Sequence, residues 1–354
     1  MVTESALQIS NHLFQFDLAA VIANLGKDLE LLRGKRLFIS GGTGFFGRWI
    51  LESLVYANEE LELGLFVCVL SRNPEQFLKR APHFSGSPLL EFIQGDVRSF
   101  TFPEMQFDYV IHAANDTALA KDADASQILH ETIVNGTARM LEFAERCKAR
   151  GFLLVSSGSV YGVQPPTMLN ICEDYECSSG SYDAKDAYRA GKRKAEELCL
   201  LKANDPFLKV KIARCFAFIG PLLPLDGRYA AGNFIGNAIS GQAINISGDG
   251  TPLRSYLYAS DLVVWLLKIL LQGKSAYPYN VGSQEVVSIR ELAEMVALSV
   301  NPPVKVVIKR KAVSGGLPDR YVPDTFRARE SLGLKQTVGL HDMITRTIEW
   351  YSQR

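Results

Sequence analysis

The feature that most constrains this chain is a short apolar segment that runs directly into a cluster of glycines. Residues 36–40 (RLFIS) have the composition of a buried strand, and GGTGFFG follows at 41–47. Phe46, Ile50 and Leu54 then recur at helical spacing, which indicates a helix that starts at the glycines. Glycine lets a pyrophosphate approach the backbone, and the free N–H groups of a helix N-terminus favour its negative charge. The segment therefore predicts a dinucleotide-binding site, with an ordinary βα turn as the alternative.

Further apolar segments follow at intervals that suit a parallel sheet. They lie at residues 65–70, 90–94, 109–112, 152–156 and 209–215. Helical patterns fill the long stretches between them, the longest at residues 125–150. Apolar strands that alternate with helices are typical of a parallel sheet covered on both faces. The pattern predicts an α/β fold with a Rossmann-type, doubly wound parallel sheet.

The two ends of the chain differ from this central part. Residues 1–34 contain an amphipathic helical pattern, for which Asp17 suits the N-cap and Gly26 the C-cap. In the last third, glycines and prolines divide the chain into short elements. We therefore expect an N-terminal helical extension at 1–34 and the dinucleotide-binding Rossmann domain at 35–215. Residues 216–354 are expected to form mainly a smaller, mixed α/β substrate lobe, with some segments returning to the Rossmann domain.

Composition argues against several kinds of partner. Lys+Arg and Asp+Glu both number 38, without blocks of like charge, which argues against nucleic acid or an anionic membrane surface. The apolar run at residues 262–271 is too short to span a bilayer, and the N-terminus lacks a secretion-signal pattern. The six cysteines show no Cys-x-x-Cys spacing, so we expect no metal site. A disulfide or redox pair of Cys172 and Cys177 is the less favoured alternative. We expect a cytoplasmic protein.

A tyrosine and a lysine four residues apart carry the clearest catalytic signal. Tyr188 and Lys192 lie in a helical pattern and share one face, where the ammonium can lower the pKa of the phenol from its reference of about 10. Such a phenol can exchange a proton with a sugar hydroxyl or carbonyl. Ser157 stands upstream at the end of a predicted strand, where its hydroxyl can hold the reacting oxygen. Without Ser157, the Tyr-x-x-x-Lys spacing would be read as a surface pair.

Taken in order, the motifs resemble those of an extended short-chain dehydrogenase/reductase of the nucleotide-sugar epimerase/dehydratase/ketoreductase branch. The resemblance runs from about Gly34 to the C-terminus. The matching motifs are SGGTGFFG at 40–47, GDVR at 95–98, HAA at 112–114, Ser157 ahead of VYG at 160–162, Tyr188 with Lys192, GDG at 248–250 with Arg254, and YNVG at 279–282.

The resemblance implies roles for individual residues. Ser157, Tyr188 and Lys192 are the implied catalytic triad. The implied cofactor contacts are Gly41, Thr43, Gly44, Phe45, Phe46, Gly47, Asp96, Val97, Ala113, Ala114, Asn115 and Lys192. The implied substrate contacts are Ser157, Ser159, Asn233, Arg254 and Arg320. The alternatives are an ordinary turn residue for Asp96 and a solvated loop arginine for Arg254.

Departures from the family pattern narrow the reaction. Sugar-nucleotide 4,6-dehydratases carry an acidic pair after the catalytic Ser or Thr, because eliminating water needs its own acid and base. Gly158 and Ser159 occupy those positions here, which disfavours a dehydratase. Ile133 and Ala217 stand where many relatives have asparagines, and these losses leave the pose of the substrate open.

The end of the second predicted strand bears on the cofactor. An acidic residue there would bind the ribose 2′-OH and repel a 2′-phosphate, whereas Ser71 and Arg72 suit that phosphate. We therefore prefer NADP(H), with NAD(H) as the alternative; a solvated turn arginine would carry no such information.

The resemblance implies hydride transfer at a sugar carbon, usually C4, of a nucleotide-activated sugar. With NADPH the simplest reaction is a net reduction. We expect a 4-ketoreductase whose substrate is a nucleoside-diphosphate 4-keto-6-deoxyhexose, with dTDP as the preferred nucleotide. Such an enzyme supplies deoxysugars for bacterial surface polysaccharide such as lipopolysaccharide O-antigen. The alternatives are an NAD-dependent 4-epimerase and a non-catalytic nucleotide-binding protein. Family habit also implies a homodimer through the helices predicted at 125–150 and 184–201.

Overall fold

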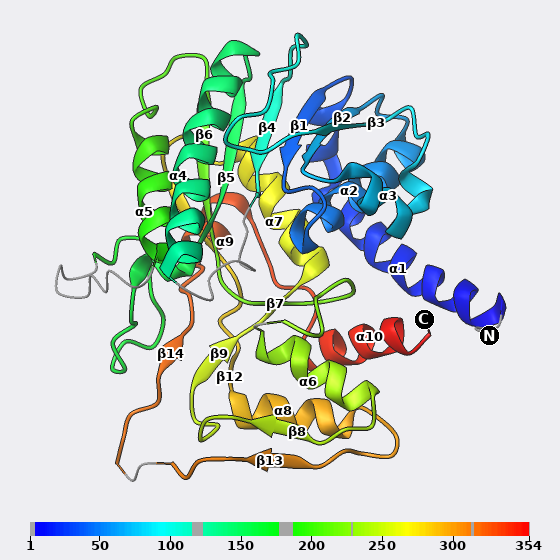
Figure 1. The fold of residues 1–354 in the computed structure, drawn as a ribbon, viewed down its shortest axis with the longest axis vertical. Coiled ribbons are helices and arrows are strands. Elements are labelled where there is room, and N and C mark those ends of the chain that lie inside the picture. The colour runs from blue at the N-terminus through cyan, green and yellow to red at the C-terminus, as the bar shows by residue number, and fades with distance from the viewer. Residues whose placement is uncertain (1–3, 115–122, 177–186, 228, 313–314, 354) are drawn as a thin grey trace.

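The computed structural model describes residues 4–114, 123–176, 187–227, 229–312 and 315–353. Seven strands form the central sheet in the order β11-β6-β5-β4-β1-β2-β3, and every pairing in it is parallel (Figure 1). They are β1 (Arg36–Ser40), β2 (Phe66–Ser71), β3 (Leu90–Gln94), β4 (Tyr109–His112), β5 (Gly151–Ser157), β6 (Lys209–Cys215) and β11 (Pro278–Val281). The strand order reverses beside β1, so the predicted doubly wound sheet is confirmed.

Helices cover both faces of this sheet. One face carries α1 (Glu4–Leu25), α2 (Phe45–Leu61), α3 (Pro74–Arg80) and α7 (Ala259–Gln272), and the other carries α4 (Ala123–Arg146) and α5 (Ala187–Leu200). On β1, Leu37 and Ile39 join the core on the first face, while Phe38 joins the core on the second. Because both faces are buried, the strand is apolar at successive positions without alternating.

Most of the remaining elements form a smaller lobe, drawn below the sheet in Figure 1. Its own core lies between α6 (Ala230–Ile239), α8 (Ile289–Leu298) and α10 (Leu340–Ser352). Its short strands are β7 (Phe218–Ile219), β8 (Ile244–Ile246), β9 (Leu253–Ser255), β10 (Leu257–Tyr258), β12 (Val286–Ser288), β13 (Val306–Ile308) and β14 (Arg320–Tyr321). Four short helices lie with the main sheet instead: η1 (Gly26–Leu32) packs on α1 and α7, η2 (Pro82–Phe84) on α3, η3 (Gly158–Tyr161) on α5, and α9 (Phe326–Leu332) on β11 and α7. The boundaries at residues 34 and 215 stay a prediction, while α7 and β11 pack with the sheet.

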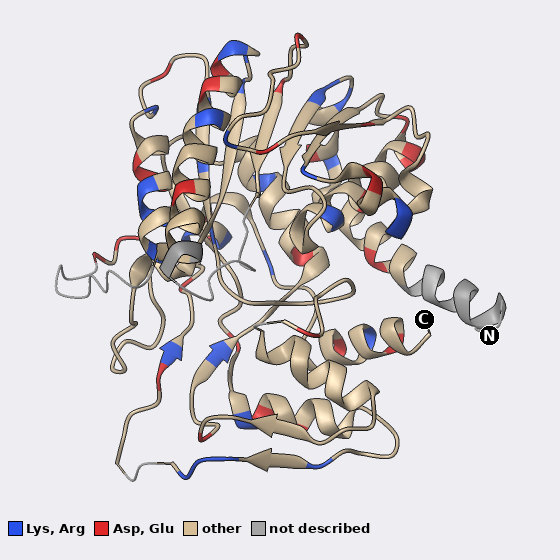
Figure 2. Ribbon diagram, viewed as in Figure 1, with Lys and Arg blue, Asp and Glu red and all other residues tan. Residues whose placement is uncertain are grey.

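The apolar run at residues 262–271 belongs to α7, which is buried on nearly all sides. A helix that is apolar all round is accounted for by such burial. Across the described ranges, no helix has the length and apolar character needed to cross a membrane. Basic and acidic side chains are interspersed along α4 and α5 (Figure 2).

The structure corrects the expected start of the N-terminal helix. Asp17 is not its N-cap, because α1 begins at Glu4 and runs through it to Leu25. The Asp17 carboxylate is instead 2% exposed and accepts hydrogen bonds from the Tyr258 hydroxyl at 2.5 Å and from Arg346 at 2.8 Å. The buried Asp17 side chain therefore links α1 to β10 and α10 by hydrogen bonds.

Replacing Asp17 with Ala is expected to lower the free energy of unfolding by about 2 to 3 kcal/mol, because Tyr258 and Arg346 would lose a buried partner. Equilibrium urea unfolding measures this. Glu30→Ala is the control, since the Glu30–Arg33 pair is about half exposed and should contribute little. Equal urea midpoints for the Asp17→Ala variant and the wild-type protein would contradict the assignment.

Candidate active site

The glycine turn between β1 and α2 has the shape of a phosphate cradle. Gly41 has a φ of +78°, and a Cβ on it would stand 2.5 Å from the Ala113 carbonyl carbon. A Cβ on Gly47 would stand 2.2 Å from the Gly41 carbonyl oxygen. Gly44 differs, because its nearest neighbour would be 3.6 Å away. The fold itself therefore requires Gly41 and Gly47, whereas Gly44 keeps open a space beside the start of α2.

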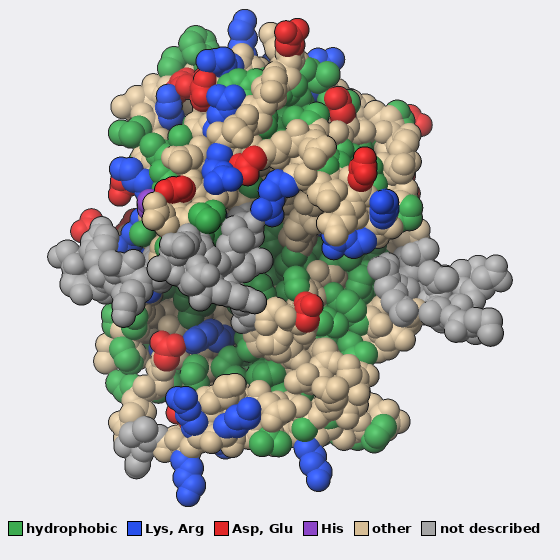
Figure 3. Space-filling model, in the orientation of Figure 1, with side chains coloured by type: hydrophobic (Ala, Val, Ile, Leu, Met, Phe, Trp, Pro, Cys, Tyr) green, Lys and Arg blue, Asp and Glu red, His purple; other side chains and the backbone are tan. Residues whose placement is uncertain are grey.

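A cavity of about 860 Å³ opens at the carboxyl ends of the strands, between the sheet and the smaller lobe. Figure 3 shows the molecule hollowed between its upper and lower parts, with hydrophobic side chains in the hollow. The predicted residues that line the cavity are Gly41, Gly44, Phe45, Phe46, Gly47, Ala113, Ser157, Ser159, Tyr188, Lys192 and Arg254. The fold thus brings the cradle, the proposed triad and one substrate arginine to a single cavity.

Other predicted residues lie away from this lining. They are Thr43, Ser71, Arg72, Asp96, Val97, Ala114, Asn233 and Arg320. Asn115 lies outside the described residues. Asn233 sits in the first turns of α6, whose residues Ala230 and Ala231 do reach the cavity.

The proposed triad is assembled by β5 and α5. Lys192 is 3% exposed, donates a hydrogen bond to the Val155 carbonyl at 2.8 Å, and places its Nζ 5.9 Å from the ring centroid of Tyr188. Burial lowers the pKa of Lys192 to about 8, so the ammonium still keeps its proton at neutral pH. The Ser157 hydroxyl accepts a hydrogen bond from the Ser159 N–H at 3.2 Å.

A buried histidine supports the floor of the cavity. The Thr137 hydroxyl donates to the Ile133 carbonyl, so its oxygen is left to accept from Nε2–H of His112 at 3.1 Å. Nδ1 of His112 then accepts from the Ser40 hydroxyl at 2.7 Å. Burial lowers the pKa of His112 to about 3, which keeps the imidazole neutral. The hydrogen bonds of His112 thus link β4 to β1 and α4 next to Ala113. The uncharged imidazole adds no positive charge to the cavity.

An ion pair holds α5 against the sheet. The Glu196 carboxylate accepts from Arg214 at 2.8 Å and from the Ser156 hydroxyl at 2.5 Å, and Arg214 also donates to the Tyr161 hydroxyl at 2.9 Å. Burial raises the pKa of Tyr161 above its usual range, so its hydroxyl remains protonated and donates to Asn280 at 2.7 Å. These contacts fix the helix that carries Tyr188 and Lys192.

Two arginines surround the carboxylate at the ends of β2 and β3. Asp96 accepts from Nε and NH2 of Arg98 at 2.8 and 2.9 Å, and these bonds are the main reason that the pKa of Asp96 is lowered. Arg72 adds a smaller attraction to the same carboxylate. Ser71 is buried and accepts from the Asn73 N–H at 3.3 Å. This corner therefore places two guanidinium groups beside Asp96, and Glu131 adds a smaller attraction to Arg98.

The strand pair β9 and β14 presents one arginine and one tyrosine to the cavity. The pairing is parallel, with Tyr321 opposite Arg254 and Arg320 opposite Leu253. Because successive residues of a strand point to opposite faces, Tyr321 borders the cavity with Arg254, whereas Arg320 turns away and donates to the Leu169 carbonyl at 3.3 Å. Arg320 is a predicted substrate contact and Tyr321 is not, since the register of β14 cannot be predicted from so short a segment.

Comparison with known proteins identifies the family. The model of the NAD dependent epimerase/dehydratase family matches residues 37–282. The chain belongs to this family. The predicted membership of the extended short-chain dehydrogenase/reductase branch is thereby confirmed, as is the expectation of an NAD(P)-dependent enzyme.

Curated relatives resemble this epimerase/dehydratase chain in sequence, and solved structures resemble it in fold. UDP-glucuronic acid decarboxylase 3 of Arabidopsis thaliana is 30% identical over 87% of this chain and 86% of its own length. The structure of UDP-glucose 4-epimerase from Thermotoga maritima has a TM-score of 0.74 at 21% identity, covering 89% of this chain and 98% of that one. DesIV, a dTDP-glucose 4,6-dehydratase from Streptomyces venezuelae solved with NAD bound, has a TM-score of 0.74 at 24% identity and coverages of 89% and 96%.

Two departures of this epimerase/dehydratase chain from its family pattern, Ile133 and Gly158, have packing explanations. Ile133 on α4 packs against Gly191 on α5, where a Cβ would lie 3.2 Å from it. A Cβ on Gly158 would meet the Phe216 ring and the Tyr321 hydroxyl, each at 2.7 Å.

Among the described residues that line the cavity, none is Asp, Glu or His. Nor does any group of three or more His, Cys, Asp and Glu in the described ranges have the arrangement to hold a metal ion.

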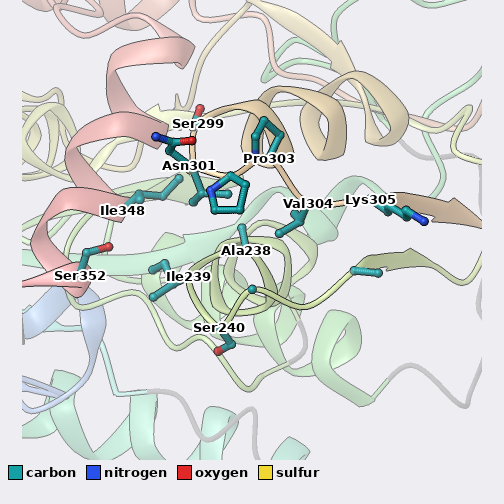
Figure 4. A pocket seen from close by; sticks show the side chains of 14 residues that line it. Ala238, Ile239, Ser240, Ser299, Asn301, Pro303, Val304, Lys305, Ile348 and Ser352 are labelled. Carbon is teal, nitrogen blue, oxygen red and sulfur yellow. The ribbon is translucent and has the colours of Figure 1, made fainter.

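A second cavity, of about 850 Å³, lies in the smaller lobe where α6, α8 and α10 end (Figure 4). Its described lining contains one charged residue, Lys305, and otherwise small, apolar or uncharged polar side chains such as Ile239, Asn301 and Ile348. No predicted site residue borders it. The predicted catalytic residues Ser157, Tyr188 and Lys192 therefore border the first cavity and not the second.

Proposed function

We propose that this chain is an NADPH-dependent 4-ketoreductase. Its substrate is a nucleoside-diphosphate 4-keto-6-deoxyhexose, with dTDP as the preferred nucleotide. The observation that carries the proposal is that Ser157, Tyr188 and Lys192 border the same cavity as the glycine cradle, while its described lining contains no carboxylate. Hydroxyl, phenol and ammonium suffice to protonate a ketone oxygen as hydride arrives. Elimination of water would need an additional acid and base.

The cavity fits a dinucleotide. The space beside Gly44 and the free N–H groups at the start of α2 suit a pyrophosphate, and Ala113 borders the path toward the triad. NADPH, when bound there, supplies the hydride. Tyr188 donates the proton to O4 of the sugar, and Ser157 holds that oxygen by a hydrogen bond. Lys192 places a positive charge near the phenol, which favours release of its proton.

Arg254 and the start of α6 are proposed to hold the diphosphate of the substrate. Arg254 donates to Asp319 at 2.9 Å and to the Leu253 carbonyl at 2.8 Å, which fixes its guanidinium at the cavity wall. The N-terminal residues Tyr229 to Ala231 border the same cavity. Both features favour negative charge.

The decisive assay is loss of absorbance at 340 nm with the purified protein, NADPH and dTDP-4-keto-6-deoxyglucose. We expect oxidation of NADPH together with formation of a dTDP-6-deoxyhexose. Release of CO₂ from UDP-glucuronic acid, the reaction named in the relatives' descriptions, would contradict the ketoreductase. So would formation of the 4-keto-6-deoxy sugar from dTDP-glucose.

Arg72→Asp is expected to shift the ratio of kcat/KM for NADPH over NADH by about tenfold or more toward NADH, because a carboxylate repels a 2′-phosphate and binds a ribose 2′-OH. Initial rates with both cofactors measure this ratio. Arg80→Asp, which changes an exposed arginine of α3 and the net charge equally, is the control. An unchanged ratio in Arg72→Asp would remove Arg72 from the cofactor site and return NAD(H) to first place.

An NAD-dependent 4-epimerase is the second candidate. It is favoured by the solved neighbour described above with NAD bound and by the epimerase among the solved structures. Such an enzyme would keep NAD through purification and interconvert UDP- or GDP-hexoses without net oxidation. Release of NAD on denaturing the purified protein, together with interconversion of a UDP- or GDP-hexose and no NADPH oxidation, would establish this reading.

We also propose a homodimer and the division of the chain at residues 34 and 215. Apolar side chains of α4 and α5, including Ile128 and Leu200, are exposed on the outer faces of these helices. Burying such side chains against a second copy would stabilise a dimer. Sedimentation that shows only monomer at micromolar concentration would contradict it.

A further inference from the structure

Tyr321 stands at the catalytic end of the cavity, although no motif of the sequence pointed to it. Its ring packs on Phe216, with centroids 4.6 Å apart and an interplanar angle of 36°. Its hydroxyl lies 2.7 Å from the point where a Cβ on Gly158 would stand, which is immediately beside Ser157. The ring contact and the pairing of β14 with β9 therefore fix this phenol next to a triad residue.

Tyr321 and Ser157 both border the cavity, and the Tyr321 hydroxyl lies beside Gly158, within hydrogen-bonding reach of the Ser157 side chain. Burial raises the pKa of Tyr321 above its usual range and outweighs the lowering by the contact with Ser157, so the phenol keeps its proton and can act as a donor. The Ser157 oxygen has two lone pairs and one hydrogen, and the Ser159 N–H already occupies one lone pair. A donor from Tyr321 on the other lone pair leaves the hydrogen of Ser157 free to point into the cavity.

We propose that Tyr321 is a positioning residue that turns the Ser157 hydroxyl toward the reacting oxygen of the nucleotide sugar. The inference rests on the proposed function, because it assumes that a sugar oxygen lies between Ser157 and Tyr188. It adds a residue from the smaller lobe to a reaction centre otherwise built by β5 and α5. The lobe then both binds the substrate and completes the hydrogen bonds of the triad.

The same phenol limits which chemistry the site can host. Phe216 and Tyr321 together fill the space next to Gly158, so no side chain fits at residue 158 while both rings stay in place. The neutral Tyr321 hydroxyl thus occupies the position that an acidic side chain at residue 158 would take. The arrangement favours orientation of a carbonyl over elimination.

The test compares the wild-type protein with Tyr321→Phe, Ser157→Ala and the double variant. Tyr321→Phe keeps the ring and its contact with Phe216 and removes only the hydroxyl. We expect kcat for NADPH oxidation to fall about tenfold in Tyr321→Phe and about a hundredfold in Ser157→Ala. The KM for NADPH and the urea midpoint of Tyr321→Phe should stay unchanged. Because Tyr321 acts through Ser157, the double variant should be no slower than Ser157→Ala.

Full activity of Tyr321→Phe, or losses that multiply in the double variant, would overturn the inference. Calorimetric binding of dTDP-glucose to the same four proteins gives a readout that needs no turnover. If the wild-type protein binds dTDP-glucose but reduces no keto sugar, the ketoreductase proposal fails. The inference then stands only if both single variants weaken binding and the double variant adds no further loss. A wild-type protein that binds neither dTDP-glucose nor UDP-glucose overturns both proposals.

Discussion

Replacing Tyr188 with Phe is expected to lower kcat for NADPH oxidation by about a thousandfold. The variant keeps the aromatic ring beside Lys192 and loses only the proton donor, so the affinity for NADPH should change less than twofold, a change of about 0.4 kcal/mol. Stopped-flow or steady-state absorbance at 340 nm measures kcat. Quenching of protein fluorescence by NADPH measures binding in the same preparation.

Tyr109→Phe is the matched control for this experiment. Tyr109 begins β4 at the amino edge of the sheet, and the catalytic cavity lies at the opposite, carboxyl edge. Its loss of a hydroxyl should leave kcat unchanged. Near-normal turnover of the Tyr188→Phe variant, beside a normal Tyr109→Phe variant, would refute Tyr188 as the proton donor.

Gly47→Ala is expected to destabilise the fold by about 3 kcal/mol or more, because its Cβ would press on the Gly41 carbonyl oxygen and the Gly42 backbone at 2.2 and 2.4 Å. These are main-chain atoms that cannot rotate away as a side chain can. The loss should appear as a lower urea midpoint in the absence of any cofactor. Reduced yield of folded protein would accompany it.

Gly44→Ala is the matched variant, and it is expected to weaken the binding of NADPH without lowering the stability of the fold. Its Cβ would have 3.6 Å of clearance, so the urea midpoint should stay close to that of the wild-type protein. The methyl group would project beside the start of α2 into the space proposed for the pyrophosphate, and the Kd for NADPH should rise about tenfold or more. Unchanged binding in Gly44→Ala would show that the dinucleotide lies elsewhere. An undisturbed urea midpoint in Gly47→Ala would contradict the packing of the turn.

Much of the sheet could be predicted because its strands are buried on both faces. Successive apolar residues in β1, β2 and β5 indicate such strands directly, and the glycine cradle identifies the first of them. The strand β11 was missed. It is four residues long and starts at a proline, and its place beside β6 depends on pairing with a segment more than 60 residues earlier in the chain. Short apolar segments of this kind carry no readable period.

The same limit applied to individual site residues. Ser157, Tyr188 and Lys192 were readable because their spacing and local elements bring them together. Tyr321 was not, since its position depends on a two-residue strand whose partner, β9, lies far away along the chain. Asp17 was misread as a helix cap for a related reason. Its partners come from β10 and α10, and nothing near Asp17 in the sequence indicates a buried ion pair.

Gly158 has a consequence for how this chain can diverge from its relatives. A mutation that gave residue 158 an acidic side chain would meet Phe216, which follows β6, and Tyr321, which belongs to β14. No single codon change relieves both contacts. An acid at this position would therefore have to displace the ends of two side chains that come from separate parts of the chain. Packing around Gly158 thus restricts which side chains evolution can place beside Ser157.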